Sequence, residues 1–426
     1  MQQDHVTGRA RALVGSPYAW VVLGLLTLIY ISSFVDRQII AVLATQIQDE
    51  LDLSNFQVGL LYGPAFSLIY AVCGIPMGRL ADLYSRRVMI VAGLLVWSAM
   101  TFISGFATSL AFLISARFFV GISESALSPA VYSLLSDYFR PRQRATVFSI
   151  YASGIFIGIG TAFLAGGAVA RLYDWRTALM AVGAPGIVLA GVAWVAIKEV
   201  PRGLTQTAAQ YEPDMPLKEV LNFILRKKTI LLHFAGFSFL AMTGYTVLGF
   251  LGTILTDIHD AAHLIPHYGW FMLATALSVV LSGKVADYLA GRWNAGSRFL
   301  MGIVAGLACL PLYYLGFFAE SGVSALLLIG SANVISSSYN GVAAALIQYL
   351  VRPNMRAIAG GLYLFIISVV GFGIGPPLAG WLMDEVFTGP YGPAMAVFLI
   401  VTCCGILGSA CFWLAMQTYD ADEEVD

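Results

Sequence analysis

The chain has 426 residues, of which 59% are hydrophobic and 11% are charged, and its mean hydropathy is +0.80. An average soluble protein carries about 25% charged residues, so this composition excludes a single soluble domain, and it excludes disorder, which requires low hydrophobicity. The net charge of −1 argues against nucleic acid as a main partner. The apolar runs are continuous, which favours spanning helices over a barrel, whose strands would alternate apolar and polar residues.

A membrane-spanning helix needs about 20 mostly apolar residues, and twelve such stretches follow one another along the chain. They cover residues 18–45, 56–80, 87–107, 110–136, 143–170, 176–197, 229–255, 267–290, 298–318, 322–350, 356–384 and 392–416. The first stretch is too long for a removable signal peptide, and it contains Asp36 and Arg37. We therefore predict an all-α membrane protein with twelve transmembrane helices.

The basic residues gather on one side of these predicted spans. All but four of the 23 Lys and Arg residues fall on the side that carries the N-terminus. Arg171 and Arg176 lie on the opposite side, whereas Arg37 and Arg117 lie within spans. Because cytoplasmic loops are enriched in Lys and Arg, we predict that both termini are cytoplasmic. In a bacterium, the protein would be an integral protein of the plasma (inner) membrane.

A polar, proline-containing loop divides the spans six and six. We predict an N-terminal six-helix bundle over 1–197, a cytoplasmic linker over 198–228, and a C-terminal six-helix bundle over 229–426. The linker ends in Arg226-Lys227-Lys228, which we expect at the anionic inner leaflet. The last residues, Asp420 to Asp426, form an acidic tail that we expect to be mobile.

The loop after the second span is repeated after the eighth. The run Gly78-Arg79-Leu80-Ala81-Asp82 is matched by Gly283-Lys284-Val285-Ala286-Asp287, and each run leads to further basic residues. A repeat at equivalent places in the two halves indicates a duplicated six-helix unit.

This repeat resembles the signature of the major facilitator superfamily, although Ser85 stands where that family usually has Gly. The resemblance implies two pseudo-symmetric six-helix bundles and alternating access around a site near the membrane midplane. Gly78 would allow close helix approach, and Asp82 would meet Arg142 or the positive N-terminus of span 11. The alternative is that Asp82 and Arg86 only end a helix and follow the charge topology. The implied gating residues are Gly78, Asp82, Arg86, Arg87, Arg142 and Asp287.

Four ionisable residues lie inside predicted spans: Asp36 and Arg37 in the first, Arg117 and Glu124 in the fourth. Such residues are costly in a membrane and are functional candidates by default. Arg117 and Glu124 share one helix face because they are seven residues apart. We predict that Asp36 pairs with Arg117, that Arg37 lies nearer Glu124 or the substrate, and that one carboxylate takes up a proton during the cycle. A purely structural network is the alternative.

The same four residues carry a narrower resemblance. Phe34-Val35-Asp36-Arg37, together with Arg117-x-x-x-Gly121-x-x-Glu124, is similar to the spinster family, whose animal members are associated with sphingolipids and lysophospholipids. The resemblance implies that Asp36, Arg37, Arg117 and Glu124 bind substrate and couple protons. Anion:cation symporters share a similar pattern, so they remain an alternative.

Spans 7 and 10 offer neutral polar groups instead of charges. Tyr245, Asn333, Ser337 and Asn340 are candidate cavity residues. One charged wall and one apolar wall with hydroxyl groups would suit an amphiphile, whereas the alternative for the serine-rich run is a small-residue packing seam.

These features predict a secondary active transporter that works by alternating access. We expect proton coupling and an amphiphilic or anionic substrate of the lysolipid or sphingolipid kind; the alternative is a proton-coupled symporter of small organic anions. We expect a monomer among membrane lipids, with protons as its coupling partner and no cofactor besides the proton gradient. GxSxG, HExxH and Walker motifs are absent from the sequence, so we expect no enzyme activity. His259, His263 and His267 have helical spacing, but Pro266 interrupts it, and we expect no metal site.

Overall fold

The computed structural model describes residues 12–202, 204–205, 215–352 and 355–423. Within these ranges the chain forms helices joined by turns and contains no strand. Twelve helical segments are long and apolar enough to cross a membrane. The predicted all-α class and the predicted number of spans are therefore confirmed.

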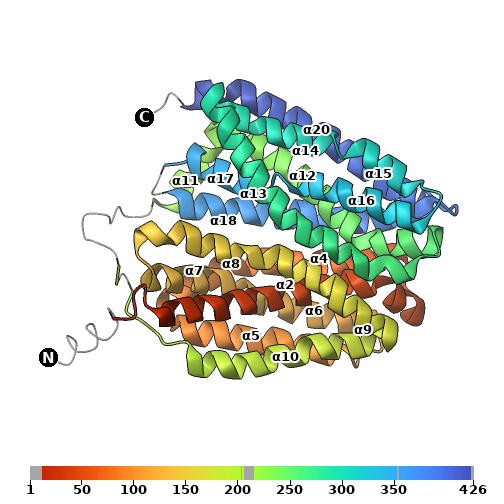
Figure 1. Ribbon diagram of the computed structural model, residues 1–426, viewed down its shortest axis with the longest axis horizontal. Helices are drawn as coiled ribbons and strands as arrows, with labels where there is room; N and C mark the ends of the chain where they lie inside the picture. The colour runs from red at the N-terminus through yellow and green to blue at the C-terminus, as the bar shows by residue number, and fades with distance from the viewer. Residues whose placement is uncertain (1–11, 203, 206–214, 353–354, 424–426) are drawn as a thin grey trace. The chain divides into compact units, whose positions relative to one another are not determined.

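The chain divides into two compact units. The first contains residues 1–39 and 69–212, and the second contains residues 40–68 and 213–426. The units differ from the predicted bundles because residues 40–68 group with the C-terminal helices. Within each unit the helices run roughly parallel to one another (Figure 1).

The N-terminal unit contains most of the first six spans. Its helices are α2 (Pro17–Leu51), which continues into the other unit, α4 (Pro64–Leu83), which begins there, α5 (Arg86–Ser104), α6 (Leu110–Ser125), α7 (Leu127–Tyr138), α8 (Pro141–Thr161), the π-helix η1 (Ala162–Gly166), α9 (Gly167–Leu172) and α10 (Trp175–Ala196). Three of them begin at a capping side chain, because Ser85, Ser109 and Asp174 each accept a hydrogen bond from a backbone N–H of the first turn.

The C-terminal unit contains the remaining spans together with α3 (Asn55–Tyr62). Its other helices are α11 (Leu217–Arg226), α12 (Lys228–Thr253), the π-helix η3 (Ile254–Ile258), the 3-10 helix η4 (Ala262–His267), α13 (Tyr268–Arg292), the 3-10 helix η5 (Ala295–Phe299), α14 (Leu300–Leu307), α15 (Leu310–Phe317), α16 (Gly322–Ser337), α17 (Asn340–Leu350), α18 (Arg356–Ile367), the π-helix η7 (Ser368–Phe372), α19 (Gly373–Glu385) and α20 (Gly392–Glu423).

Prolines explain two breaks within spans. Pro129 has no N–H for the carbonyl of Ser125, and α6 gives way to α7 at this point. Pro376 and Pro377 likewise lack donors for carbonyls one turn earlier, and η7 gives way to α19 just before them. π-Helical turns of the η7 kind are frequent at functional sites.

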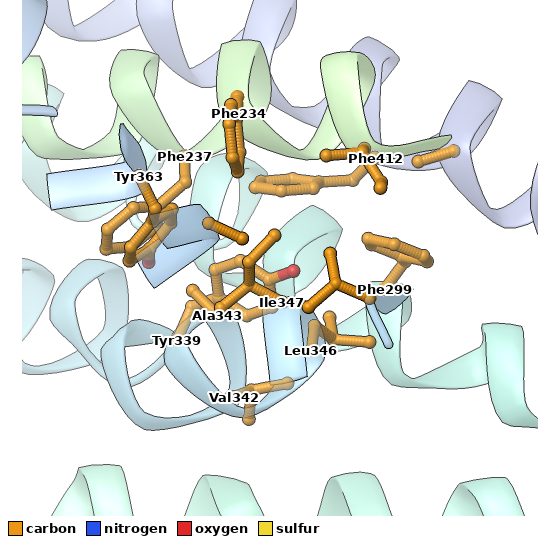
Figure 2. Close-up of a cluster of buried hydrophobic side chains, with 14 of the residues drawn as sticks. Phe234, Phe237, Phe299, Tyr339, Val342, Ala343, Leu346, Ile347, Tyr363 and Phe412 are labelled. Carbon is orange, nitrogen blue, oxygen red and sulfur yellow. The ribbon is translucent and has the colours of Figure 1, made fainter. Parts of the chain in front are cut away.

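Aromatic side chains fill the core of the C-terminal unit. Phe234 and Phe237 of α12, Tyr339 before α17, Tyr363 of α18 and Phe412 of α20 converge there (Figure 2). Each of these side chains is buried. Because lipid tails are as apolar as these side chains, close packing rather than escape from water holds such helices together.

The acidic tail differs from its prediction. α20 continues to Glu423, so the tail is helical as far as the structure describes it. The Asp422 carboxylate accepts a hydrogen bond from the N–H of Thr229 at 2.8 Å, and its carbonyl accepts one from Lys227. The carboxylate of Asp422 thus caps the positive N-terminus of α12.

Candidate functional site

The four ionisable residues predicted inside spans lie in the N-terminal unit. Asp36 and Arg37 come from α2, and Arg117 and Glu124 come from α6. Asp36, Arg117 and Glu124 are each at most 2% exposed, and the Arg37 side chain is 10% exposed. All four belong to helices that cross the apolar region, where charged groups lose the hydration that water would supply.

Arg37 forms an ion pair with Glu124. Its Nη2 donates to Oε2 of Glu124 at 2.8 Å. The guanidinium also lies 4.6 Å from the ring centre of Phe34 and 4.7 Å from that of Tyr70, where cation–π attraction supports it. The predicted proximity of Arg37 and Glu124 is therefore confirmed, and Tyr70 of α4 joins the site.

The predicted pairing of the Asp36 and Arg117 side chains is wrong. Nη1 of Arg117 donates to the backbone carbonyl of Asp36 at 2.8 Å, not to its carboxylate. The carboxylate instead faces the donors Trp97 and Thr101 of α5, although neither reaches full hydrogen-bonding geometry. The rotation of α2 decides this outcome, because it turns the side chain of Asp36 toward α5.

The site consequently contains incompletely satisfied charges. Neither carboxylate oxygen of Asp36 has a hydrogen-bond partner among the described residues, and the same holds for Nη2 of Arg117 and Oε1 of Glu124. Burying such groups is expensive, and a proton or a ligand of opposite charge would lower the cost. The arrangement therefore suits proton uptake by a carboxylate and anion binding by a guanidinium.

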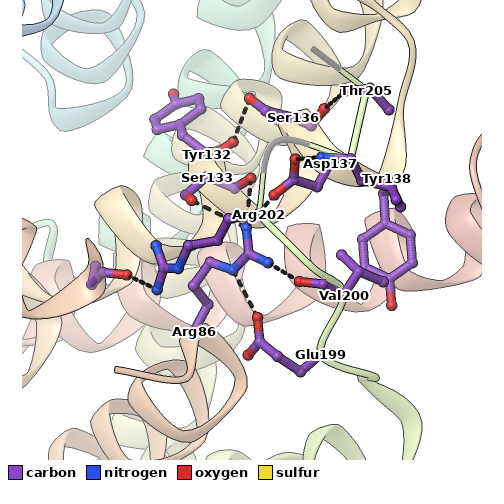
Figure 3. Close-up of polar contacts among 12 residues, drawn as sticks. Arg86, Tyr132, Ser133, Ser136, Asp137, Tyr138, Glu199, Val200, Arg202 and Thr205 are labelled. Carbon is purple, nitrogen blue, oxygen red and sulfur yellow. Dashed lines mark hydrogen bonds and ion pairs between the residues drawn. The ribbon is translucent and has the colours of Figure 1, made fainter. Parts of the chain in front are cut away.

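A second charged cluster surrounds Arg86, one of the predicted gating residues (Figure 3). The fully buried guanidinium donates to Asp137 at 2.5 Å, to Glu199 at 2.8 Å and to the carbonyl of Val200. Arg86 thus ties the start of α5 to the end of α7 and to the chain after α10. Sequence reasoning missed Asp137 and Glu199 as partners, although both lie at span ends near basic loops.

Arg87 completes this cluster through its backbone. The N–H of Arg87 donates to Oε2 of Glu199 at 2.9 Å, and the hydroxyl of Ser85 donates to the same oxygen at 2.7 Å. The guanidinium of Arg87 lies 4.2 Å from the centre of the Trp194 ring. Burial acts to raise the pKa of Glu199, but the hydrogen bonds from Arg87, Ser85 and Arg86 outweigh it and lower the pKa.

The other predicted gating residues are less closely tied. The side chain of Asp82 lies outside the described part of the chain, and Arg142 is exposed. Asp287 lies 3.4 Å from Arg298, and its side chain is 69% exposed. The predicted close approach at Gly78 is wrong, because a Cβ there would lie 3.9 Å from the ring of Pro129, an ordinary contact distance.

The candidate cavity residues of the C-terminal unit occupy different surroundings. Tyr245 stacks on Phe372 of η7, with ring centres 4.3 Å apart. Asn333 is 1% exposed and accepts a hydrogen bond from Tyr313, which favours a packing role over its predicted place on a cavity wall. Ser337 is half-buried, and its carbonyl accepts a hydrogen bond from the exposed Asn340 at 2.7 Å.

One polar contact in the C-terminal unit was not expected from the sequence. The carboxylate of Asp384, near the end of α19, accepts hydrogen bonds from the N–H groups of Asn55 and Phe56 at 3.1 and 2.8 Å, and from the Asn55 side chain at 2.8 Å. It therefore caps the N-terminus of α3, where N–H groups lack partners within the helix.

Glycines allow α3 and α19 to meet closely at this contact. A Cβ on Gly380 would lie 2.2 Å from the carbonyl oxygen of Asn55, and one on Gly59 would lie 2.5 Å from the carbonyl oxygen of Pro376. Neither position can accept a side chain without movement of the backbone. No local motif in the sequence predicts this contact, because its partners lie more than 300 residues apart.

Possible metal ligands do not cluster in the described residues: no group of three or more His, Cys, Asp or Glu side chains could hold a metal ion. His263 and His267 belong to the 3-10 helix η4, and His259 precedes it. The regular helical spacing that could align the three histidines is therefore broken.

Comparisons with known proteins agree with this architecture. The model of the Major Facilitator Superfamily matches residues 26–376. An "MFS-type efflux pump" of Mycolicibacterium smegmatis is 31% identical over 96% of this chain and 95% of its own length. A "Hexuronate transporter" of Bacillus subtilis is 25% identical over 85% of this chain and 87% of its own length. A solved bacterial homologue of the human lysosomal transporter Spinster, described as inward-facing and occupied, is 26% identical and covers 96% of this chain and 98% of its own, with a TM-score of 0.81.

Proposed function

Since the chain belongs to the major facilitator superfamily, whose members are transporters rather than enzymes, we propose that it is a proton-coupled secondary transporter of an amphiphilic or anionic substrate. The buried ion pair between Arg37 and Glu124 carries this proposal. A scaffold would gain little from such a pair, because buried ion pairs are weak contributors to stability. A transporter can use this ion pair, because a proton can bind Glu124 and an anionic substrate can bind Arg37, each in competition with the pair.

The coupling step follows from the chemistry of the pair. A proton on Glu124 would remove the negative charge that the guanidinium of Arg37 now faces at 2.8 Å. The released guanidinium would then bind an anionic group of the substrate through charge-assisted hydrogen bonds. Loss of the proton would restore the ion pair and expel the anion. Asp36 is the second candidate acceptor, because its buried carboxylate makes no hydrogen bond of full geometry with the described residues.

Alternating access requires contacts that close one side of the membrane and break when that side opens. We assign this role to the α3–α19 contact, because Asp384 reaches from the end of span 11 to the first turn of span 2. The basic residues predict that this contact lies on the outer side and that both termini are cytoplasmic. The Arg86 cluster lies within the N-terminal unit and would hold that unit together throughout the cycle.

Two substrate classes remain to be separated. The likeness to a solved spinster homologue, together with the association of animal spinster proteins with sphingolipids and lysophospholipids, supports a lysolipid or sphingolipid. The relative named as a hexuronate transporter supports the alternative, a small organic anion carried together with protons. Both classes offer an anionic group for Arg37 or Arg117, so these two residues do not distinguish a lipid from a small organic anion.

A ligand screen followed by flux measurements tests the proposal. Purified protein would be screened by thermal shift against lysophospholipids, sphingoid phosphates and small carboxylates, and the stabilising compound would be used in proteoliposomes. We expect an imposed pH gradient to change the flux of wild-type protein but not that of Glu124→Gln. Glu385→Gln, which alters an exposed carboxylate, should behave as wild type. A wild-type response to the gradient in Glu124→Gln would contradict the assignment of Glu124, and binding only of hydrophilic carboxylates would favour the alternative substrate.

A further inference from the structure

The amphipathic helix α11 lies in the segment that joins the two sequence halves and ends two residues before α12 begins. One face packs on the C-terminal unit, where Val220 and Ile224 are at most 4% exposed beside α12 and α18. A second apolar face is less covered, because Leu217 is 46% exposed, Leu225 is 64% exposed and Leu221 is half-buried. These leucines lie four residues apart, so they form one stripe along the helix, called here the leucine stripe.

Basic residues lie on α11 beside this stripe and on nearby parts of the C-terminal unit. Lys218 and Arg226 of α11 and Lys228 at the start of α12 are exposed, as are Arg352 after α17 and Arg356 at the start of the neighbouring helix α18. These five residues are called the basic collar. The ring of Phe223 has Lys227 5.8 Å and Arg352 5.9 Å from its centre, so the collar continues across the helix. Glu219 is the one acidic residue within α11.

The chemistry of this surface identifies its partner. α12 begins a candidate membrane span at Lys228, so α11 stands where apolar and aqueous surroundings meet. A second copy of the chain would place one basic collar against another, which repulsion disfavours. A membrane surface instead offers acyl chains for leucines and phosphate groups for Lys and Arg, and basic amphipathic helices bind such surfaces.

We propose that α11 is an interfacial helix that binds anionic phospholipid in the membrane leaflet next to the start of α12. The leucine stripe enters the boundary of the acyl chains, and the basic collar binds the lipid phosphates. Val220 and Ile224 belong to the same core as Tyr339 and Tyr363. Lipid bound to α11 therefore anchors the start of α12, and the lipid composition becomes a factor in the stability of the C-terminal unit.

The depth of two spin labels tests the position of the helix. Leu225→Cys and Asn222→Cys would each be labelled in a full chain whose five native cysteines are replaced by alanine. Both positions are exposed, but Asn222 lies about 60° farther from the buried face. In vesicles of phosphatidylcholine with phosphatidylglycerol, the Leu225 label should be more accessible to oxygen and less accessible to a soluble nickel complex than the Asn222 label. Equal nickel accessibility at both sites, or exclusion of both probes from Leu225 by a second protein copy, would overturn the proposal.

A matched pair of charge variants tests the lipid class. Lys218→Gln/Arg226→Gln removes one Lys and one Arg from the collar, and Lys284→Gln/Arg292→Gln removes the same residue types from exposed positions on α13. A basic residue near an anionic surface contributes about 1 kcal/mol, so the collar variant should bind phosphatidylglycerol about thirtyfold more weakly. Native mass spectrometry with added phosphatidylglycerol or phosphatidylcholine measures this difference. Unchanged phosphatidylglycerol binding by the collar variant, or an equal loss in the α13 variant, would refute the proposal.

Discussion

The two units of the chain fill their interiors with different chemistry. In the N-terminal unit, the described residues include five buried charged side chains, and charged atoms of Asp36, Arg117 and Glu124 have no hydrogen-bond partner among the described residues; the five are Asp36, Arg86, Arg117, Glu124 and Asp137. In the C-terminal unit, an aromatic cluster surrounds the buried His233, whose Nε2 lies 3.0 Å from the carbonyl oxygen of Ala343 and whose ring stacks on Tyr363. On the proposed mechanism, the first interior changes its charge during a transport cycle, whereas the second serves as a packed support.

The largest expected effect concerns the Arg37–Glu124 pair. Arg37→Met should destabilise the protein by about 3–5 kcal/mol, because it leaves the buried carboxylate of Glu124 without its partner. Arg37→Met/Glu124→Leu should recover most of that loss, because it removes both charges. Denaturant unfolding in detergent micelles would measure the two variants. If the double variant were no more stable than Arg37→Met, the charges would not be coupled and the contrast between the units would fail.

A core truncation in the C-terminal unit should act through packing alone. Phe412 is fully buried between Phe299 and Tyr339, so Phe412→Ala should cost about 3–5 kcal/mol by creating a cavity. Phe412→Leu should cost less because it fills more of the space. Transport per folded molecule should keep its wild-type pH response in both variants, measured by flux normalised to the folded protein. A changed pH response would show that the C-terminal core takes part in coupling.

The close contact between α3 and α19 gives the third prediction, through a glycine of α19. Gly380→Ala would force a Cβ against the carbonyl of Asn55, and overpacking of this kind costs about 1–3 kcal/mol. Gly244→Ala is the matched control, because a Cβ at that position meets nothing within 4 Å. Cross-linking of Asn55→Cys with Asp384→Cys should be slower in the Gly380→Ala background than in the Gly244→Ala background. Equal cross-linking rates would mean that the α3–α19 contact tolerates the added methyl group.

The sequence predicts the fold and the membership of the site better than it predicts the pairings within the site. The spans could be found because each needs only a long apolar run, and Asp36, Arg37, Arg117 and Glu124 were conspicuous because they interrupt such runs. The sequence does not determine the rotation of each helix about its own axis. Spans that are apolar on all sides carry no periodic pattern that would fix it.

The wrong or missed pairings have two causes. The sequence does not fix the rotation of each helix, and the contact partners lie far apart in the sequence. Arg117 reaches the carbonyl of Asp36 and not its carboxylate, since the side chain of Asp36 turns toward α5. The partner of Arg86 at Glu199 lies 113 residues away, and the partner of Asn55 at Asp384 lies 329 residues away. No local motif marks either contact, because each depends on how distant spans come together.

The smallest expected effect concerns Glu199, which joins the Arg86 cluster from the aqueous side. Hydrogen bonds lower its pKa in the folded protein, so its stabilising contribution is present above the ordinary glutamate pKa and is lost as the pH falls through the folded pKa. Glu199→Gln should therefore lower the melting temperature near neutral pH, and the difference from wild type should shrink in acid. The cost should be about 1 kcal/mol or less, because the side chain is 35% exposed and solvent screens the pair. Asp287→Asn, which alters a more exposed pair with Arg298, should change stability still less. A larger loss for Glu199→Gln in acid than at neutral pH would reverse the sign and contradict the assignment. The proposed pH response of the N-terminal unit would then rest on the buried Arg37–Glu124 pair of α2 and α6 alone.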